Sequence, residues 1–434
     1  MLKKGVMIAV CSVLTAGMVF AWGSKKTSGK TGGKIVIKMG DNLPDRKNGM
    51  GAVIETINAE FKKTHPNVEF VTESYQDQPW QEKVKIYATA NQLPDVMKYW
   101  SFPGMMKPLV DAGMLMPLNK SDFTQYKFMA GSLEGNEYDG KLYGIPMSAD
   151  MWVIYVNTDL FKKAGIPVPT SWEDIIRAAP KFKAMGITPV VTDGKEGWPL
   201  CELYDSILQR INGNFGHVKA ALDDRTEKMT QSDFVKAADY IQKLVKAGVF
   251  NDNLTTSDYG DARNTFGQER AAMYMMGSWE MGLATDQAFS DHFRQSLDVI
   301  PFPVVEGGKG KATDTLAWYG GNFIISAGTK NKAVVNEYMK LLAKDFGQIC
   351  WDTKASFPCV SVTPTANDTV VAKKLLVIAA DSTSTSGTPS LDRLDSVYKE
   401  DEQEQMRQLC ALMVTPDQFA KTLDASAQRA FDAK

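Results

Sequence analysis

The segment KLYGIPMSADMWVIYVNTDLFKKAGIPVPTSW, residues 141–172, places a strand and two helix starts in close succession. Residues 151–156 are apolar at both alternating positions, which is typical of a strand buried inside a sheet. Residues 157–163 follow as a short helix that Gly165 and Pro167 end. Ser171 is a suitable cap for a further helix. The segment therefore predicts an interior strand that leads directly into helices.

The chain before this segment alternates strands with helices. Residues 34–39 have apolar side chains on one side, as in a strand, and a helical pattern then runs to Pro66. A strand at 68–71, a helix at 80–90 and a strand at 95–100 complete the order. This β-α-β-α-β order predicts a largely parallel sheet with helices on both faces. Ligands of such sheets bind at the carboxyl ends of the strands.

Strands and helices also alternate after the segment. We expect helices at 172–183, 200–211 and 231–247, and strands at 187–192 and around 271–276. The chain of 434 residues is too long for one core and suits two lobes. The sequence therefore predicts an α/β protein of two lobes.

Composition and charge exclude several classes of function. Hydrophobic residues make up 44% of the chain and charged residues 23%, which is typical of a soluble globular protein. A net charge of -2 gives no sign of a nucleic-acid partner. The three histidines are isolated, with no Cys or His at metal-ligand spacing, and no nucleophile elbow or zinc-protease motif occurs. We therefore expect no metal, no cofactor and no catalytic residues.

The N-terminus has the pattern of an exported protein. Lys3 and Lys4 precede an apolar run at 6–20, and Val19 and Ala21 form a small-residue cleavage site. This pattern predicts a signal peptide at 1–21, followed by a flexible spacer at 22–33. Cys11 lies too early for lipid attachment, so we expect a free periplasmic protein.

Four cysteines would remain after cleavage: Cys201, Cys350, Cys359 and Cys410. An oxidising compartment permits disulfides, but four cysteines allow three pairings and the sequence does not choose between them. Cys350 and Cys359 are the first pairing to consider because they are close in the sequence.

The segment quoted first resembles the family 1 extracellular solute-binding proteins of ATP-binding-cassette importers, the group that includes maltose-binding protein. The matching elements are Tyr143-Gly144-Ile145-Pro146, Asp150, the strand end at 155–159, Leu160-Phe161 and the helix start at 169–172. A second match covers residues 266–279, which end in Gly277-Ser278-Trp279. The resemblance extends over almost the whole mature chain.

The resemblance implies a type II periplasmic-binding-protein fold, in which two α/β lobes enclose a ligand cleft. It places residues 34–147 and 303–355 in the first lobe, and residues 148–302 and 356–434 in the second. The chain would cross between the lobes near 146–150, 299–304 and 355–362. We expect a monomer that delivers a carbohydrate to permease subunits in the membrane.

The resemblance also implies ligand-binding residues. Trp100, Trp198 and Trp279 match aromatic positions that stack on sugar rings, and Asp150 matches an acidic residue that accepts hydrogen bonds from sugar hydroxyls. The remaining candidates are Asp41, Trp152, Trp318, Gly320 and Arg393. Each tryptophan has the alternative role of filling the core.

Two other functions stay open. A protein of the same fold could bind a non-sugar solute such as a polyamine, a peptide or a phosphodiester. Paired carboxylates would also suit a secreted glycosidase.

Overall fold

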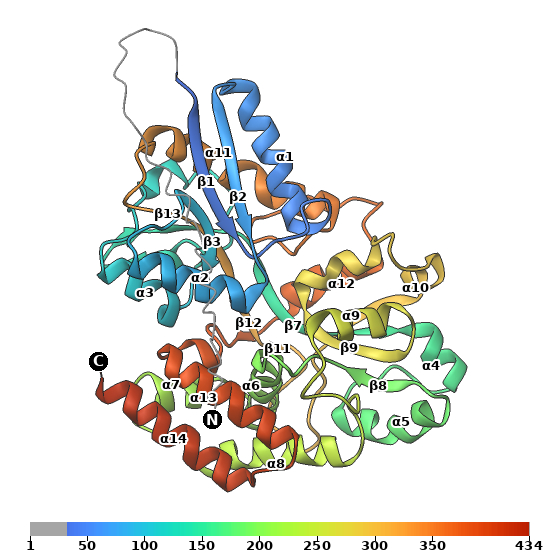
Figure 1. The fold of residues 1–434 in the computed structure, drawn as a ribbon. Helices are drawn as coiled ribbons and strands as arrows, with labels where there is room; N and C mark the ends of the chain where they lie inside the picture. The colour runs from blue at the N-terminus through green and yellow to red at the C-terminus, as the bar shows by residue number, and fades with distance from the viewer. Residues whose placement is uncertain (1–32, 434) are drawn as a thin grey trace, which may run out of the picture.

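The structure is a computed structural model that describes residues 33–433, so the predicted signal peptide and nearly all of the predicted spacer lie outside it. Figure 1 shows two lobes, with β7 (Ala149–Asn157) and β12 (Ala317–Tyr319) between them. Each lobe has its own sheet with helices packed on it, which confirms the predicted fold of two α/β lobes.

The first lobe is built on a five-stranded sheet in the order β2-β1-β3-β13-β6. The strands β1 (Ile35–Asp41), β2 (Val68–Ser74) and β3 (Val96–Trp100) are parallel. β13 (Gly321–Ile325) runs antiparallel to β3 and to β6 (Gly144–Pro146). The carboxyl ends of β1, β2 and β3 therefore meet at one edge, as the sequence predicted.

Helices cover both faces of this sheet because side chains alternate along each strand. Val96 faces a core with α1 (Gly49–Thr64) and α11 (Lys332–Thr353), whereas Met97 faces a core with α2 (Asp77–Thr89) and α3 (Pro103–Asp111). On α1 the buried residues recur at helical spacing: Val53, Ile54, Ile57 and Phe61. The predicted helix ends before Pro66, as expected.

The second lobe has the strand order β10-β7-β9-β8, and β12 pairs with the start of β7. Its further strands are β10 (Leu297–Pro301), β9 (Ala271–Gly277) and β8 (Thr188–Val191). β7 is buried from Asp150 to Asn157, as its apolar sequence predicted. Asn157 caps the following helix, and a capping box joins Ser171 to Asp174 at the next.

Helices surround this second sheet, and the C-terminal pair α13 and α14 packs on α6 and α8 (Figure 1). They are α4 (Thr158–Ala164), α5 (Trp172–Ala184), α6 (Trp198–Asn212), α7 (Gly216–Leu222), α8 (Ser232–Lys246), α9 (Tyr259–Gly267), α10 (Asp291–Ser296), α12 (Val370–Asp381), α13 (Ser396–Cys410) and α14 (Pro416–Asp432). Short strands complete the fold: β4 (Glu137–Tyr138), β5 (Lys141–Leu142), β11 (Asp314–Thr315) and β14 (Ser384–Thr385). The short 3-10 helices are η1 (Lys120–Asp122), η2 (Glu134–Asn136), η3 (Ser278–Ala284) and η4 (Ser390–Asp392).

The strand order of the two sheets shows where the chain passes from one sheet to the other. It leaves β6 and enters β7 at 147–148, and it returns between β12 and β13 at Gly320. The predicted crossing at 299–304 is wrong because β10 pairs with β7 over 297–301. Val305 and Leu316 also pack in the core of the second lobe. We therefore propose that residues 303–319 belong to the second lobe.

All four cysteines within residues 33–433 are buried and free. The pairing of Cys350 with Cys359 is therefore not present. Within these residues no helix is long and apolar enough to cross a membrane.

Candidate ligand-binding cleft

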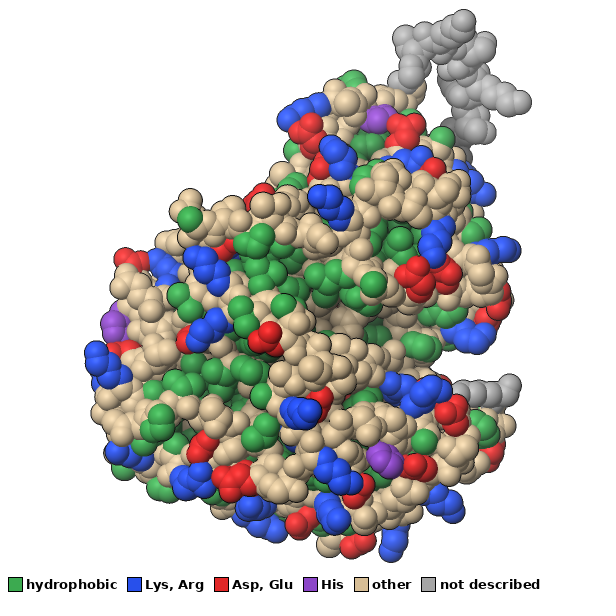
Figure 2. Space-filling view, turned by 180° about the vertical axis from the view of Figure 1, so that it is seen from behind, with side chains coloured by type: hydrophobic (Ala, Val, Ile, Leu, Met, Phe, Trp, Pro, Cys, Tyr) green, Lys and Arg blue, Asp and Glu red, His purple; other side chains and the backbone are tan. Residues whose placement is uncertain are grey.

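A cavity of about 280 Å³ lies between the two lobes. Figure 2 shows the surface of the molecule hollowed between the lobes, at the right of the view. The first lobe contributes the loops after β1 and β3 and the start of α2, and the second lobe contributes α6, η3 and η4. The polar and aromatic lining residues are Asn42, Gln76, Asp77, Gln78, Gln81, Lys98, Trp100, Phe102, Ser148, Asp150, Glu196, Trp198, Glu202, Tyr259, Trp279, Trp318, Asp392 and Lys399.

Three tryptophans of the second lobe form one aromatic wall of the cavity. The ring centroids of Trp198 and Trp279 lie 5.9 Å apart, and those of Trp279 and Trp318 lie 6.2 Å apart. All three side chains are half-buried. Trp152 is only 1% exposed and packs against the rings of Trp198 and Trp279. It supports the wall without lining the cavity.

Asp150, at the start of β7, presents a carboxylate to the cavity from a buried position. It is 9% exposed, and its Oδ1 has no hydrogen-bond partner among residues 33–433. Burial raises the pKa of Asp150 to about 6, against the hydrogen bond from Ser148 and the charge of Lys98. A carboxylate held this way gains a partner when a ligand hydroxyl or amine arrives.

Gly320 fixes the position of that carboxylate. A side chain at residue 320 would place its Cβ 1.7 Å from Oδ2 of Asp150 and 3.1 Å from Nε1 of Trp318. β12 and β7 pair Trp318 opposite Asp150. Glycine is therefore required where the chain returns to the first lobe, and its role is to let these two side chains lie close.

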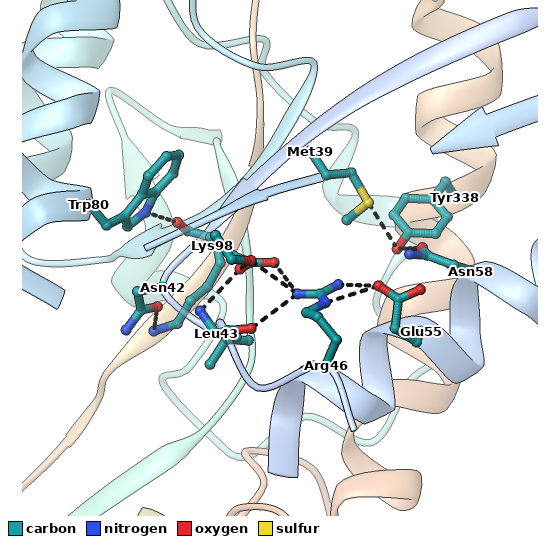
Figure 3. Close-up of polar contacts among 11 residues, drawn as sticks. Met39, Asn42, Leu43, Arg46, Glu55, Asn58, Trp80, Lys98 and Tyr338 are labelled. Atoms are coloured by element: carbon teal, nitrogen blue, oxygen red, sulfur yellow. Dashed lines mark hydrogen bonds and ion pairs between the residues drawn. The ribbon is translucent and has the colours of Figure 1, made fainter. Parts of the chain in front are cut away.

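The first lobe supplies Trp100 and a polar network behind it. Nζ of Lys98 lies 4.5 Å from the centroid of the Trp100 ring, a cation–π distance. The same amine donates a hydrogen bond to Oδ1 of Asn42 (Figure 3). The Asn42 amide in turn donates to Asp77. Burial lowers the pKa of Lys98, although the charges of Asp77 and Asp150 oppose the shift. Nε1 of Trp80 donates to the Lys98 carbonyl at 2.8 Å and holds the strand end.

The second lobe adds two acidic side chains, Glu196 and Glu202, that were not predicted from the sequence. Glu196 accepts a hydrogen bond from Nε1 of Trp198 at 3.0 Å. Glu202 is 3% exposed, and its Oε2 has no partner within the described chain. Burial, with nearby Asp205, raises the pKa of Glu202 well above its usual value. The sequence spacing could have predicted Glu202, because it follows Trp198 by four residues on α6 and therefore lies on the same face of the helix.

Four predicted residues lie outside the cavity lining. Asp41 pairs with Arg46 at 2.7 Å. Arg46 also pairs with Glu55 (Figure 3). Arg393 pairs with Asp223 at 2.7 Å. These ion pairs occupy both charges in structural contacts, so we leave Asp41 and Arg393 out of the proposed site. Trp152 and Gly320 lie directly behind the lining, in the supporting positions described above.

The cavity is suited to binding a polyhydroxylated or cationic solute. The three histidines lie elsewhere, and each contacts a glutamate. Within residues 33–433 no group of three or more His, Cys, Asp and Glu side chains could hold a metal ion. The lining offers aromatic faces, carboxylates and two lysines.

The chain belongs to the family of bacterial extracellular solute-binding proteins, whose family model matches residues 44–349. It is 24% identical over 285 residues to the Multiple sugar-binding protein of Streptococcus mutans, a match that spans 62% of this chain and 63% of that protein. It is 22% identical to the Galactooligosaccharide-binding protein of Bacillus subtilis over 92% of this chain and 90% of that one.

Solved structures agree with the fold. A structure connected with xylan utilization by Caldanaerobius polysaccharolyticus has a TM-score of 0.84 at 25% identity, covering 90% of this chain and all of that one. A chitin oligosaccharide binding protein has a TM-score of 0.82 at 21% identity, covering 92% of this chain and 99% of that one.

Proposed function

We propose that this chain is the solute-binding component of an ATP-binding-cassette importer and that its solute is a sugar or oligosaccharide. One observation carries the proposal: the tryptophan wall stands beside two buried carboxylates, Asp150 and Glu202, that each have an oxygen without a partner in the described chain. The apolar face of a sugar ring stacks on an indole, and its hydroxyls donate to such oxygens. The names of the sugar-binding relatives support the same solute class.

The two-lobed fold suggests how the solute is held and released. A ligand that contacts both lobes favours their closed arrangement, by hinge closure at the segments that cross between them. We propose that the closed, loaded monomer delivers its sugar to the permease subunits. The protein would work in the periplasm, would bind no nucleic acid, and would return the solute chemically unchanged.

A thermal-shift screen of mono- and oligosaccharides tests this proposal. A sugar present at 100-fold its dissociation constant is expected to stabilise the protein by about 2.7 kcal/mol. The same screen includes spermidine and putrescine. Stabilisation by the amines alone would reject the sugar, and release of reducing ends from an oligosaccharide would reveal a glycosidase.

A cationic solute is the second candidate. Five carboxylates line the cavity against two lysines: Asp77, Asp150, Glu196, Glu202 and Asp392 against Lys98 and Lys399. The excess of carboxylates favours a solute with protonated amines, such as a polyamine. The amine arm of the screen decides between the two.

Affinity for the sugar is expected to fall as the pH drops below about 6. The pKa of Asp150 in the free protein is about 6, and a hydroxyl donates its hydrogen bond to the ionised form. Below that pH the Asp150 carboxyl is protonated in the free protein and must lose its proton when the sugar binds. The affinity for the sugar therefore falls by up to about tenfold per pH unit. Isothermal titration from pH 7.5 to 5 measures the change.

The free energy of unfolding of the ligand-free protein should change with pH in the opposite direction to the affinity, again because of Asp150. The folded pKa lies above the usual value of 3.8, so the folded state binds the proton more tightly and gains stability as the pH falls from about 6 to 4. The Asp150→Asn variant should lose both the pH dependence of sugar affinity and this pH dependence of stability. If this variant keeps the pH dependence of binding, another carboxyl is responsible.

A further inference from the structure

The short helix η4 is tied into the wall of the cleft by two carboxyl groups. Leu391 and Asp392 on this helix line the cavity between the lobes. At its first residue, the amide of Ser390 donates to Oδ2 of Asp205 at 2.8 Å, and the Ser390 hydroxyl donates to Oε1 of Glu402 at 2.6 Å. Asp205 lies on α6 and Glu402 on α13, so Ser390 connects both helices to the cleft wall.

Both carboxyl groups are buried and incompletely hydrogen-bonded. Asp205 and Glu402 are each 0% exposed. Oδ1 of Asp205 and Oε2 of Glu402 have no hydrogen-bond partner among the residues that the structure describes. A buried carboxyl is stable in its ionised form only when it is paired and fully hydrogen-bonded, and otherwise it keeps its proton. The two groups therefore do not both ionise in the folded protein.

The cations near this pair are each bound to another carboxylate. Nζ of Lys399 lies 2.8 Å from Oδ1 of Asp392, and Nη1 of Arg393 lies 2.7 Å from Oδ2 of Asp223. The other titratable groups that face the pair are acids: Cys201, Glu202 and Tyr204 on α6, Asp392 on η4, and Tyr398 on α13. These surroundings leave the pair without a free cation, and a retained proton takes its place.

Burial raises the pKa of Asp205 and of Glu402, and the charge of Asp205 raises the pKa of Glu402 further. Two interacting carboxyls titrate as a pair. We propose that Asp205 and Glu402 retain one proton between them and act as positioning residues, because this proton keeps η4 in the wall of the cleft. When η4 opens, water reaches the carboxyls and the proton is released. Opening is therefore favoured as the pH rises. This inference does not depend on which solute the cleft binds.

Hydrogen exchange of the ligand-free protein, followed by mass spectrometry of peptides that cover residues 388–394, tests the proposal. The protection factor, corrected for the intrinsic exchange rate at each pH, measures the opening of η4. One proton released on opening is expected to lower this factor by up to about tenfold per pH unit as the pH rises from about 5.5 to about 7.5.

Two variants remove the need for the shared proton. Glu402→Gln and Asp205→Asn each replace one carboxyl by an amide of nearly the same shape, so the remaining carboxylate has a neutral neighbour. Each variant is expected to lose the fall in protection with pH. Glu404→Gln is the matched control, because Glu404 is an exposed glutamate on the same helix as Glu402. It should keep the wild-type slope.

Infrared spectra at neutral pH give an independent readout. The carbonyl stretch of protonated carboxyls should be weaker in either variant than in the wild type. The melting temperature identifies a variant that has failed to fold, and either folded variant suffices for the comparison. A wild-type protection factor that does not change with pH would overturn the proposal. A folded variant that keeps both the wild-type slope and the wild-type infrared band would overturn it as well.

Discussion

Replacing Trp279 with alanine is expected to weaken sugar binding about ten- to a hundredfold. Trp279 is half-buried at the centre of the wall, between Trp198 and Trp318, and presents part of its ring to the cavity. Losing a flat apolar contact of this size costs about 1.5–3 kcal/mol of binding free energy, which corresponds to that range of affinities. Isothermal titration of the variant measures the loss.

Trp152→Ala provides the matched comparison, since Trp152 touches the same wall but is fully buried. That change leaves a cavity in the core and should lower the free energy of unfolding by about 3–5 kcal/mol. Trp279→Ala should lower it by less, because its ring is partly exposed and its Nε1 bond to the Tyr259 hydroxyl lies at the cleft. Denaturant unfolding of the free proteins checks both values. An unchanged affinity in Trp279→Ala, together with a loss of stability as large as that of Trp152→Ala, would show that Trp279 is a core residue.

Much of the fold could be predicted from the sequence because its signals are local. The buried strand β7 reads as a continuous apolar run, and the caps at Asn157 and Ser171 mark the helices after it. The place of β10 could not be predicted in this way. Its pairing with β7 joins segments about 140 residues apart, and the sequence of a strand does not state its partner. The second crossing was misplaced for that reason.

In the candidate site, too, some residues could be predicted from the sequence and others could not. The aromatic wall followed from the resemblance, whereas Lys98 and Glu202 were missed because a polar residue inside a strand or helix gives no local sign that it faces a cleft. Asp41 and Arg393 were chosen by position. Their partners, Arg46 and Asp223, show that each neutralises a charge in the fold, and such a partner is known only once the chain is folded.

Replacing Gly104 with alanine is expected to weaken ligand binding about ten- to a hundredfold without unfolding either lobe. Gly104 lies at the start of α3 in the first lobe, against the turn that follows η4 in the second. A Cβ there would lie 2.1 Å from the carbonyl oxygen of Leu394 and 3.4 Å from that of Asp392. Both are backbone atoms, so they cannot rotate away as a flexible side chain would.

The cost of this clash, about 1–3 kcal/mol by analogy with overpacked sites, should fall on the closed arrangement of the lobes. The contact lies between lobes, so a small opening relieves it while each core stays intact. The closed arrangement, which binds the ligand, is then less populated, and the apparent affinity falls by the same factor as its population. Titration measures the affinity, and small-angle X-ray scattering measures the compaction that ligand produces. Gly328→Ala, where the nearest atom would be Oγ of Ser326 at 3.5 Å, should bind as the wild type does. Should Gly104→Ala bind and compact normally, the approach of α3 to η4 is no part of closure.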